Sequence, residues 1–459
     1  MAGIEEISAV LGPKLSPEAA IILPGGSDFA GITARWREHQ APAVSVVVKV
    51  ATESDVQETV RYADEHNIPF IARSGGHGAT GAMSKAKSSI QIDFRSLNHV
   101  KLSEDGKSAA IGGGANVKDT VDKLAALRKR TDKLVGISAL ALGRGHGWLQ
   151  GQYGLVADQV VSARLVLPNG NLVTVSDDSY PDLFWAIKGA GHNFGLVTEW
   201  EFSVYNDQPQ WSYEIFLFSG DKLEALYSLA NEQMKTQPPE LIYWGYIIKP
   251  ILWFGVIYNG SQEAVKRYAK PFYDIGPLNV QTGKGQIHDL AVITYQDLDG
   301  PGCAYGMTSL RYPIGLKSHN IAAVRKVYNE IDETFRRVPE VAGSFFLLEG
   351  YSTQAVEAID PDATAFPHRN DKILITSYIM YTPNDAITPL AQEFGKKLRQ
   401  YLLDGSDVPA HLRAYVNYAD GDEPLPAVYG WDDGRLEKLK KLKAKWDPKN
   451  TMRYYVPIE

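Results

Sequence analysis

The sequence predicts an α+β fold in two parts, and three observations support this. The first 205 residues alternate short apolar runs with helical patterns. From about residue 206 the expected strands are longer and rich in aromatic residues, with helices between them, which is typical of an antiparallel sheet covered on one face. The composition, 44% hydrophobic and 22% charged, is that of a globular protein able to fill a core.

The elements expected in the first part follow from local patterns. The run from Ala43 to Val50 is β-branched and predicts a buried strand. Ser54, with Gln57 three residues later, predicts the capped start of a helix that ends near Asn67. The other elements expected here are strands at 68–72, 89–94 and 194–205, helices at 116–129 and 181–189, and a hairpin of 160–167 with 172–176 around Asn169-Gly170.

The second part carries the aromatic strands. Strands are expected at 211–218, 241–248, 252–258, 344–350 and 373–381, and helices at 221–236, 261–273, 319–337 and 387–403. A charged helix over 433–445 is expected on the surface. We expect three segments: 1–205 as the first part of one domain, 206–410 as an inserted second domain, and 411–459 as a tail that returns to the first.

Charge and cysteine content exclude several classes of protein. The 459 residues carry a net charge of −7, spread along the chain, so neither DNA nor RNA is an expected partner. The single cysteine, Cys303, excludes an intramolecular disulfide, and dispersed histidines argue against a metal site.

No secretion signal or membrane-spanning stretch stands out, so we expect a cytoplasmic protein with no membrane partner. The oligomeric state is not predicted.

The densest chemical signal is the segment IARSGGHGATG, from Ile71 to Gly81. Arg73, Ser74, Gly75, Gly76, His77 and Gly78 directly follow an expected strand. Glycines let the backbone approach a ligand closely and turn its N–H groups toward phosphate oxygens. The alternative interpretation, a turn with an exposed histidine, stays open on this segment alone.

Three more glycine clusters weaken that alternative: IGGGAN from Ile111, LGRGHGWLQGQYG from Leu142 and KGAGHNFGLVTE from Lys188. GAGHNFG has one residue too many for a dinucleotide-binding fingerprint and follows a helix, which disfavours a nicotinamide Rossmann domain. No Walker loop, His-Glu-x-x-His helix or Gly-x-Ser-x-Gly elbow is present in the sequence.

In order, the segments PFIARSGGHG, IQIDFRSLN, AAIGGGA, LGRGHG, QYGLVAD and LFWAIKGAGHNFGLVTEWEF resemble the FAD-binding domain of berberine bridge enzyme-like oxidases. FPHRN, YVNYAD and KWDPKN extend the resemblance to the C-terminal end. These oxidases belong to the vanillyl-alcohol oxidase flavoprotein superfamily. The resemblance implies a two-part FAD-binding domain, formed by the N-terminal segment and the C-terminal tail, with an inserted substrate domain.

The resemblance also assigns the cofactor and its ligands. In this family the histidine at the position of His77 is bonded to the 8α-methyl group of the flavin, and its loop binds the FAD pyrophosphate. Many members add a cysteinyl bond, but Asp132 stands where that cysteine would be, so a single link through His77 is expected, similar to 6-hydroxy-D-nicotine oxidase. The cofactor-binding residues expected from the resemblance are Arg73, Ser74, Gly75, Gly76, His77, Gly78, Val135, Gly136, Gly145, His146, Gly147, Asp158, Val197 and Asn417.

Two tyrosines are the expected catalytic residues. Tyr415, Asn417 and Tyr418 resemble the active-site strand of the family, in which the asparagine holds the flavin. We take Tyr418 as the base and Tyr415 as its neighbour, although alternation in a strand would put them on opposite faces. The ordinary pKa of a phenol is near 10, so a base at neutral pH needs a lowered pKa or a concerted proton transfer.

The function expected from this resemblance is that of an FAD-dependent oxidase. It would transfer a hydride from a small hydrophobic secondary metabolite to the flavin, which O2 reoxidises to give H2O2. Val135 stands where valine accompanies oxidase behaviour in the family, although a packing role is as good an explanation. An FAD-bound cyclase or pericyclase with no net oxidation, and a dehydrogenase with another acceptor, stay open.

Overall fold

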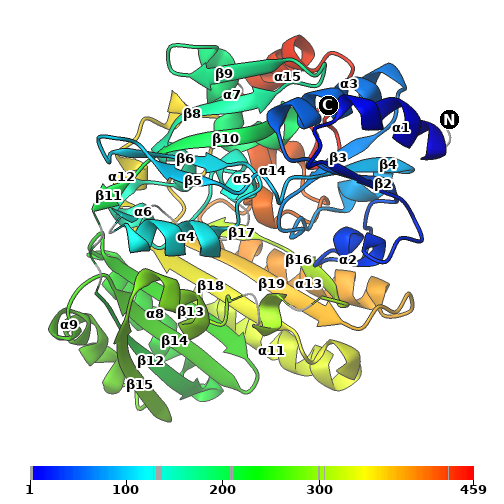
Figure 1. The fold of residues 1–459 in the computed structure, drawn as a ribbon. Coiled ribbons are helices and arrows are strands. Elements are labelled where there is room, and N and C mark those ends of the chain that lie inside the picture. The colour runs from blue at the N-terminus through cyan, green and yellow to red at the C-terminus, as the bar shows by residue number, and fades with distance from the viewer. Residues whose placement is uncertain are drawn as a thin grey trace.

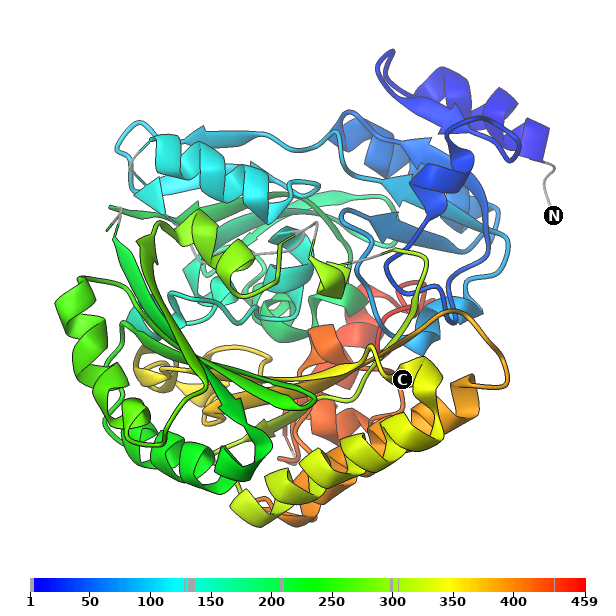
Figure 2. The same cartoon turned by 90° about the horizontal axis from the view of Figure 1, so that it is seen from below.

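Three sheets of four or more strands organise the described part of the chain (Figure 1). The structure is a computed structural model that describes residues 4–127, 129–130, 137–206, 208, 210–297, 300–303, 305–432 and 434–459. Helices cover the outer face of the largest sheet, and the two smaller sheets lie on its other side (Figure 2). The predicted α+β class is confirmed.

The first sheet carries the glycine-histidine loop at one end. Its order is β1 (Ala20–Ile22), β2 (Val44–Lys49), β4 (Ser89–Asp93) and β3 (Phe70–Arg73). Strands β2, β4 and β3 run parallel, and α3 (Glu53–Glu65) follows β2. The helix starts one residue before the predicted cap, because the Thr52 side chain accepts from the N–H of Asp55 and the Asp55 carboxylate accepts from the N–H of Thr52.

The second sheet is antiparallel. Its order is β5 (Val100–Leu102), β6 (Ser108–Gly112), β10 (Leu196–Ser203), β8 (Val160–Val166) and β9 (Leu172–Ser176). The predicted hairpin is confirmed as β8 and β9, with Val166 opposite Leu172 and Gly170 at a φ of 79°. Two helices predicted in this region are α4 (Val117–Ala126), capped by Asn116, and α7 (Pro181–Ala190).

The third sheet is antiparallel and contains all five predicted aromatic strands. Its order is β15 (Asn279–Gly285), β12 (Trp211–Ser219), β14 (Ile251–Tyr258), β13 (Leu241–Ile248), β18 (Phe345–Tyr351), β19 (Ile373–Tyr381) and β16 (Thr308–Arg311), with β17 (Ile314–Leu316) also paired to β19. Its outer face packs against α8 (Leu223–Met234), α9 (Gln262–Tyr273), α11 (Ile321–Arg337) and α13 (Thr388–Asp404).

The central strands of this sheet are buried on both faces. Every residue of β19 is buried, and β18 is buried from its second residue onward. One face meets the helices and the other faces the two smaller sheets, which explains why both strands read as nearly continuous apolar runs. A charged residue in such a strand is therefore unusual. Glu349 of β18 is one, and its buried position suggests a function.

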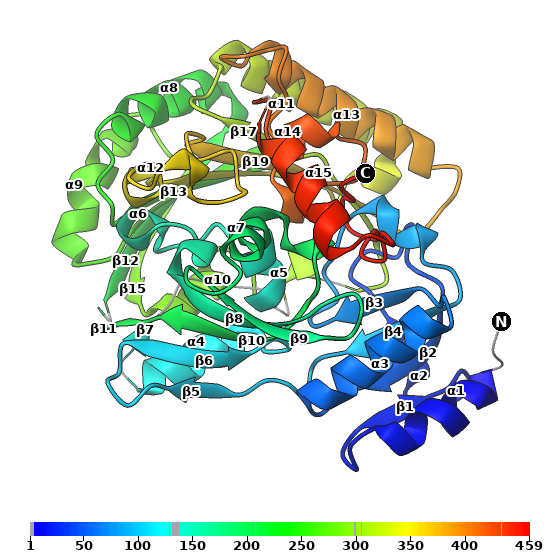
Figure 3. The same ribbon diagram turned by 90° about the horizontal axis from the view of Figure 1, so that it is seen from above.

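The C-terminal tail packs against the first 205 residues, with α15 (Arg435–Trp446) beside α7 (Figure 3). Asn193 is fully buried at this contact: its backbone carbonyl accepts from the Lys443 ammonium at 2.9 Å, and its side chain accepts from the N–H of Ile458 at 3.0 Å. These contacts agree with a two-part first domain, while the domain limits at 205 and 410 stay a prediction.

Shorter α-helices and two-residue strands lie before and between these elements. They are α1 (Ile4–Leu11), α2 (Phe29–Thr33), α5 (Ile137–Leu142), α6 (Gln150–Tyr153), α10 (Leu290–Ile293), α12 (Gln354–Glu357) and α14 (Leu425–Tyr429), and the two-residue strands β7 (Lys129–Arg130) and β11 (Tyr205–Asn206). Within the residues described, no helix combines the length and apolarity that a bilayer crossing requires.

Candidate flavin and substrate site

A cavity of about 270 Å³ lies between the glycine-histidine loop and the inner face of the largest sheet. Its wall includes most of the site residues predicted from the sequence: Arg73, Ser74, Gly75, Gly76, His77, Gly78, His146, Gly147, Val197, Tyr415, Asn417 and Tyr418. These residues come from segments more than 300 positions apart, and the fold brings them together around one space. That common space is the candidate site.

Four predicted residues are not among the described residues that line the cavity. Val135 and Gly136 lie outside the described residues, as does Asp132. Gly145 and Asp158 are described but do not line the cavity. Asp158 is buried in ion pairs with Arg144 and, at 2.9 Å, with Arg369. Asp158 therefore holds the Gly143–Gly147 loop to the FPHRN segment, and a direct cofactor contact for it stays a prediction.

Two buried arginines line the cavity beside the glycine-rich loop: Arg73 ends β3, and Arg35, which the sequence analysis missed, lies between α2 and β2. Arg35 and Arg73 are each 5% exposed. Nε and Nη2 of Arg35, and Nε and Nη1 of Arg73, have no hydrogen-bond partner among the residues that the structure describes. Burial, and then the nearby charge of Arg73, lower the pKa of Arg35 to about 10. Two unsatisfied guanidinium groups beside the glycines would suit the pyrophosphate of FAD.

His77 stands at the junction of the loop and the cavity. Both of its ring nitrogens are buried and meet no hydrogen-bond partner in the described part of the chain, and its ring stacks 6.2 Å from that of Trp36. Burial, and then the charge of Arg311, lower the pKa of His77 to about 4. The imidazole is therefore neutral at pH 7, which is the nucleophilic form that a bond to the flavin requires. The loop and its histidine fit the cofactor.

Cys303 also lines this cavity, although it is remote in sequence from the TDKLVG segment. The backbone carbonyl of the preceding Gly302 accepts a hydrogen bond from the Trp36 indole at 2.7 Å. Burial raises the pKa of the Cys303 thiol. A thiol held in its protonated form is a weak nucleophile, so the arrangement favours a histidyl link over a cysteinyl one.

The two tyrosines face the same cavity, which corrects the expected strand. Residues Val416–Tyr418 form a single 3-10 turn, so strand alternation does not apply. The rings of Tyr415 and Tyr418 lie 5.1 Å apart, and the Asn417 amide donates to the Tyr415 hydroxyl at 2.7 Å. Both phenols therefore reach the site together with Asn417.

Tyr418 is joined to a carboxylate that the sequence analysis did not single out. Its hydroxyl donates to Oε1 of Glu349 at 2.9 Å. Glu349 is 1% exposed and lies on β18, where it interrupts the apolar run SFFLL. Burial, and then the Glu349 charge, raise the pKa of Tyr418 well above its ordinary value. An acidic residue in an otherwise apolar central strand was the available signal.

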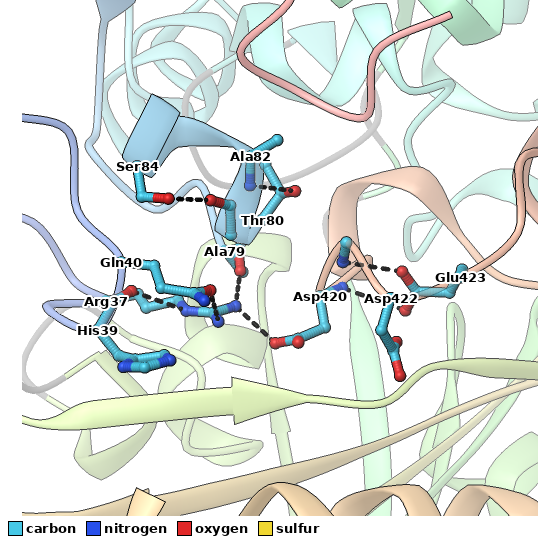
Figure 4. Close-up of polar contacts among 12 residues, drawn as sticks. Arg37, His39, Gln40, Ala79, Thr80, Ala82, Ser84, Asp420, Asp422 and Glu423 are labelled. Atoms are coloured by element: carbon cyan, nitrogen blue, oxygen red, sulfur yellow. Dashed lines mark hydrogen bonds and ion pairs between the residues drawn. The ribbon is translucent and has the colours of Figure 1, made fainter. Parts of the chain in front are cut away.

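A buried charge network fixes the tyrosine segment to the histidine loop (Figure 4). The Arg37 guanidinium donates to Asp420 Oδ1 at 2.6 Å and to the backbone carbonyl of Ala79. The N–H of Gly81 donates to the backbone carbonyl of Asp420 at 2.7 Å, and Glu423 accepts from the N–H of Asp420 at 3.1 Å. The network therefore holds the segment after Tyr418 against the segment after His77.

Comparison with known proteins identifies the class of the fold and site. Residues 44–176 match the family model described as FAD binding domain, and residues 414–459 match the model described as Berberine and berberine like. Among solved structures, chitooligosaccharide oxidase superposes with a TM-score of 0.86 at 21% identity, covering 99% of each chain. The 6-hydroxy-D-nicotine oxidase of Arthrobacter nicotinovorans gives a TM-score of 0.83 at 21% identity, covering 97% of this chain and 98% of that one.

Relatives of higher identity are named FAD-linked oxidoreductases. FAD-linked oxidoreductase anuG of Penicillium roqueforti is 37% identical, over 99% of this chain and 92% of its own length. FAD-linked oxidoreductase chry5 of Gibberella zeae is 37% identical over 98% of this chain and 94% of its own length. The chain belongs to the berberine bridge enzyme-like family of FAD-linked oxidoreductases, and it is an enzyme.

Proposed function

We propose that the protein is an FAD-dependent oxidase that carries its flavin on His77 and oxidises a small hydrophobic secondary metabolite. A flavin bound there would supply the hydride acceptor for the substrate, and O2 would take up the electrons to give H2O2. The observation that supports this most directly is the Tyr418–Glu349 pair, which faces the same cavity as His77 and supplies the acid-base group that alcohol or amine oxidation needs.

The pair would act as a proton relay. Because its pKa is raised, the Tyr418 phenol is protonated at neutral pH and is a poor base by itself. Its hydroxyl already donates to Glu349, so a lone pair of the Tyr418 oxygen is available to a substrate O–H or N–H. As the substrate proton moves to Tyr418, the original phenol proton moves to the carboxylate. The transfer keeps tyrosinate from forming in a buried site.

The other residues would bind and orient. Arg35 and Arg73 would hold the pyrophosphate, and the asparagine amide of Asn417, fixed by Tyr415, would hold the flavin edge. His146 lines the cavity with its Nδ1 3.0 Å from the side-chain oxygen of Gln150, and burial lowers its pKa to about 4. It would therefore stay neutral and act as a packing wall beside Tyr415, from which its ring lies 4.8 Å.

Reoxidation of the flavin tests the proposal without knowledge of the substrate. The purified holoenzyme is reduced by light under anaerobic conditions and then mixed with air-saturated buffer, while flavin absorbance and peroxide are followed. An oxidase regains the oxidised spectrum rapidly and releases one H2O2 per flavin. Slow reoxidation in air would instead identify a dehydrogenase, and a purified protein without flavin would contradict the proposal entirely.

A further inference from the structure

Arg311 is a buried cation in the cavity that neither the flavin ligands nor the proton relay uses. It ends β16, lines the cavity and is 8% exposed. Its guanidinium carbon lies 4.2 Å from the ring centre of Trp36, 4.6 Å from that of Tyr378 and 4.9 Å from that of Tyr418. Three aromatic rings therefore surround the charge and fix its position.

The guanidinium has no anionic partner within the part of the chain that the structure describes. No carboxylate there lies within ion-pair distance of Arg311, its side chain forms no hydrogen bond there, and its Nε is buried without a partner. Burial of a charge is costly unless an opposite charge compensates it, and contacts with aromatic faces compensate only part. The arrangement therefore lacks an anion.

Arg311 lies on a different element from the two arginines proposed to hold the cofactor's phosphates. Arg35 and Arg73 belong to the glycine-rich side, whereas Arg311 belongs to the large sheet, with its charge over the ring of the relay tyrosine. The carboxylate of Glu349 is engaged by the Tyr418 hydroxyl at 2.9 Å. The anion that Arg311 lacks would thus lie on the substrate side of the cavity.

We infer that Arg311 binds a carboxylate of the substrate, and that the enzyme acts on an apolar organic acid. A guanidinium presents parallel N–H groups that match the two oxygens of a carboxylate, and the rings of Trp36 and Tyr378 offer apolar walls for the rest of the molecule. A substrate held in this way would have its body beside the Tyr418 hydroxyl. The inference rests on the proposed function, because it names the substrate class of the same site.

Calorimetric titration of the holoenzyme with benzoate and with benzamide tests the inference, since these probes have nearly the same shape and only benzoate is an anion. We expect benzoate to bind at least about tenfold more tightly, because a charge-assisted pair is lost with benzamide. In Arg311→Gln that preference should disappear, and in Arg311→Lys part of it should remain. Arg337→Gln, at an exposed position on α11, is the matched control and should keep the full preference.

Several results would overturn the inference: no benzoate binding, equal affinity for the two probes, or a benzoate preference that survives in a folded, flavin-loaded Arg311→Gln variant. The titration requires no turnover, so it is independent of the reoxidation measurement. Peroxide release without a benzoate preference contradicts the substrate class alone. A benzoate preference lost in Arg311→Gln, in a holoenzyme that reoxidises slowly in air, contradicts the oxidase proposal alone.

Discussion

The two walls of the cavity are built in different ways. On the cofactor side, a consecutive run that starts at the last residue of β3 supplies Arg73, the glycines and His77, so one segment carries most of the chemistry. On the substrate side, Arg311, Glu349 and Tyr418 come from β16, β18 and a 3-10 turn, and each acts through a neighbour on another element. The cofactor wall is therefore a local feature of the sequence, whereas the substrate wall is a product of the tertiary fold.

The difference between the two walls explains how proteins of one fold can keep the same cofactor loop while the residues that face the substrate change. A contiguous loop keeps its geometry through backbone turns such as the one at Gly76, which has a φ of 76°. A wall of separate side chains can be altered one residue at a time without disturbing that loop. We expect changes on the cofactor wall to act on flavin content, and changes on the substrate wall to act on turnover or binding.

The largest expected effect is on the cofactor wall. His77→Ala removes the proposed bond to the flavin, so the acid-precipitated protein should be colourless, whereas the precipitated wild type should stay yellow. The matched control, His288→Ala, removes a partly exposed histidine outside the cavity and should leave the precipitate yellow. Yellow precipitate from His77→Ala would place the bond elsewhere.

On the substrate wall, Tyr418→Phe should slow anaerobic flavin reduction by about 10²–10⁴-fold, because the variant lacks the hydroxyl that relays the proton. The flavin content should stay that of the wild type, which separates this variant from His77→Ala. Tyr415→Phe should slow reduction less, since Tyr415 binds Asn417 and Tyr418 contacts Glu349. Stopped-flow absorbance measures both, and near-normal reduction in Tyr418→Phe would remove it from the relay.

The dependence of stability on acid pH reflects buried histidines and carboxylates in both parts of the molecule. Apart from His77, whose ring the proposed flavin bond would occupy, burial lowers the pKa of four histidines to about 3 or 4: His146, His192, His319 and His368. These take up protons on unfolding, so they stabilise the fold above pH 6.5 and lose that contribution as the pH falls. Burial raises the pKa of Asp371 to about 6 and that of Glu423 to about 7, which acts in the opposite direction.

Four histidines against two carboxylates leave a net uptake of roughly two protons on unfolding, so stability should fall by roughly 2–3 kcal/mol per pH unit between pH 6 and 5. Thermal unfolding followed by circular dichroism at fixed ionic strength measures this as a falling Tm. A Tm that stays constant or rises over this interval would show that the buried carboxylates dominate.

The smallest expected effect concerns the packing behind the cofactor wall. A Cβ on Gly114 would lie 1.7 Å from the backbone oxygen of Phe94, so Gly114→Ala should cost about 1–3 kcal/mol of stability. Gly343→Ala is the control, because nothing lies within 4 Å of its added Cβ. Urea unfolding measures both, and an unchanged midpoint for Gly114→Ala would show that this backbone can move without cost.

The same contrast determines how much the sequence alone could predict. The aromatic strands and the hairpin were predicted because their patterns are local, and the histidine loop because its glycines are consecutive. Strands β15, β16 and β17 were not predicted: β15 is a largely exposed polar strand, and the other two have only four and three residues. The expected strand at Tyr415 was wrong, because the residues close a turn instead.

Residues of the site were missed where their partners are distant in sequence. Arg35 precedes the loop that it serves by about 40 positions, and Glu349 precedes Tyr418 by 69. Arg311 lies in a short strand, and its aromatic neighbours Trp36 and Tyr378 are both distant from it in the sequence. No local pattern marks such contacts, because they arise only when the large sheet closes over the loop.

Mass spectrometry of a proteolytic digest tests the central assignment most directly. The digest is made from purified, acid-denatured holoenzyme, and the flavin-containing peptide is isolated by its absorbance. The account predicts that the mass of FAD is added to the peptide containing His77 and that the peptide containing Cys303 is unmodified. FAD released free on denaturation, or attached to the Cys303 peptide alone, would contradict it.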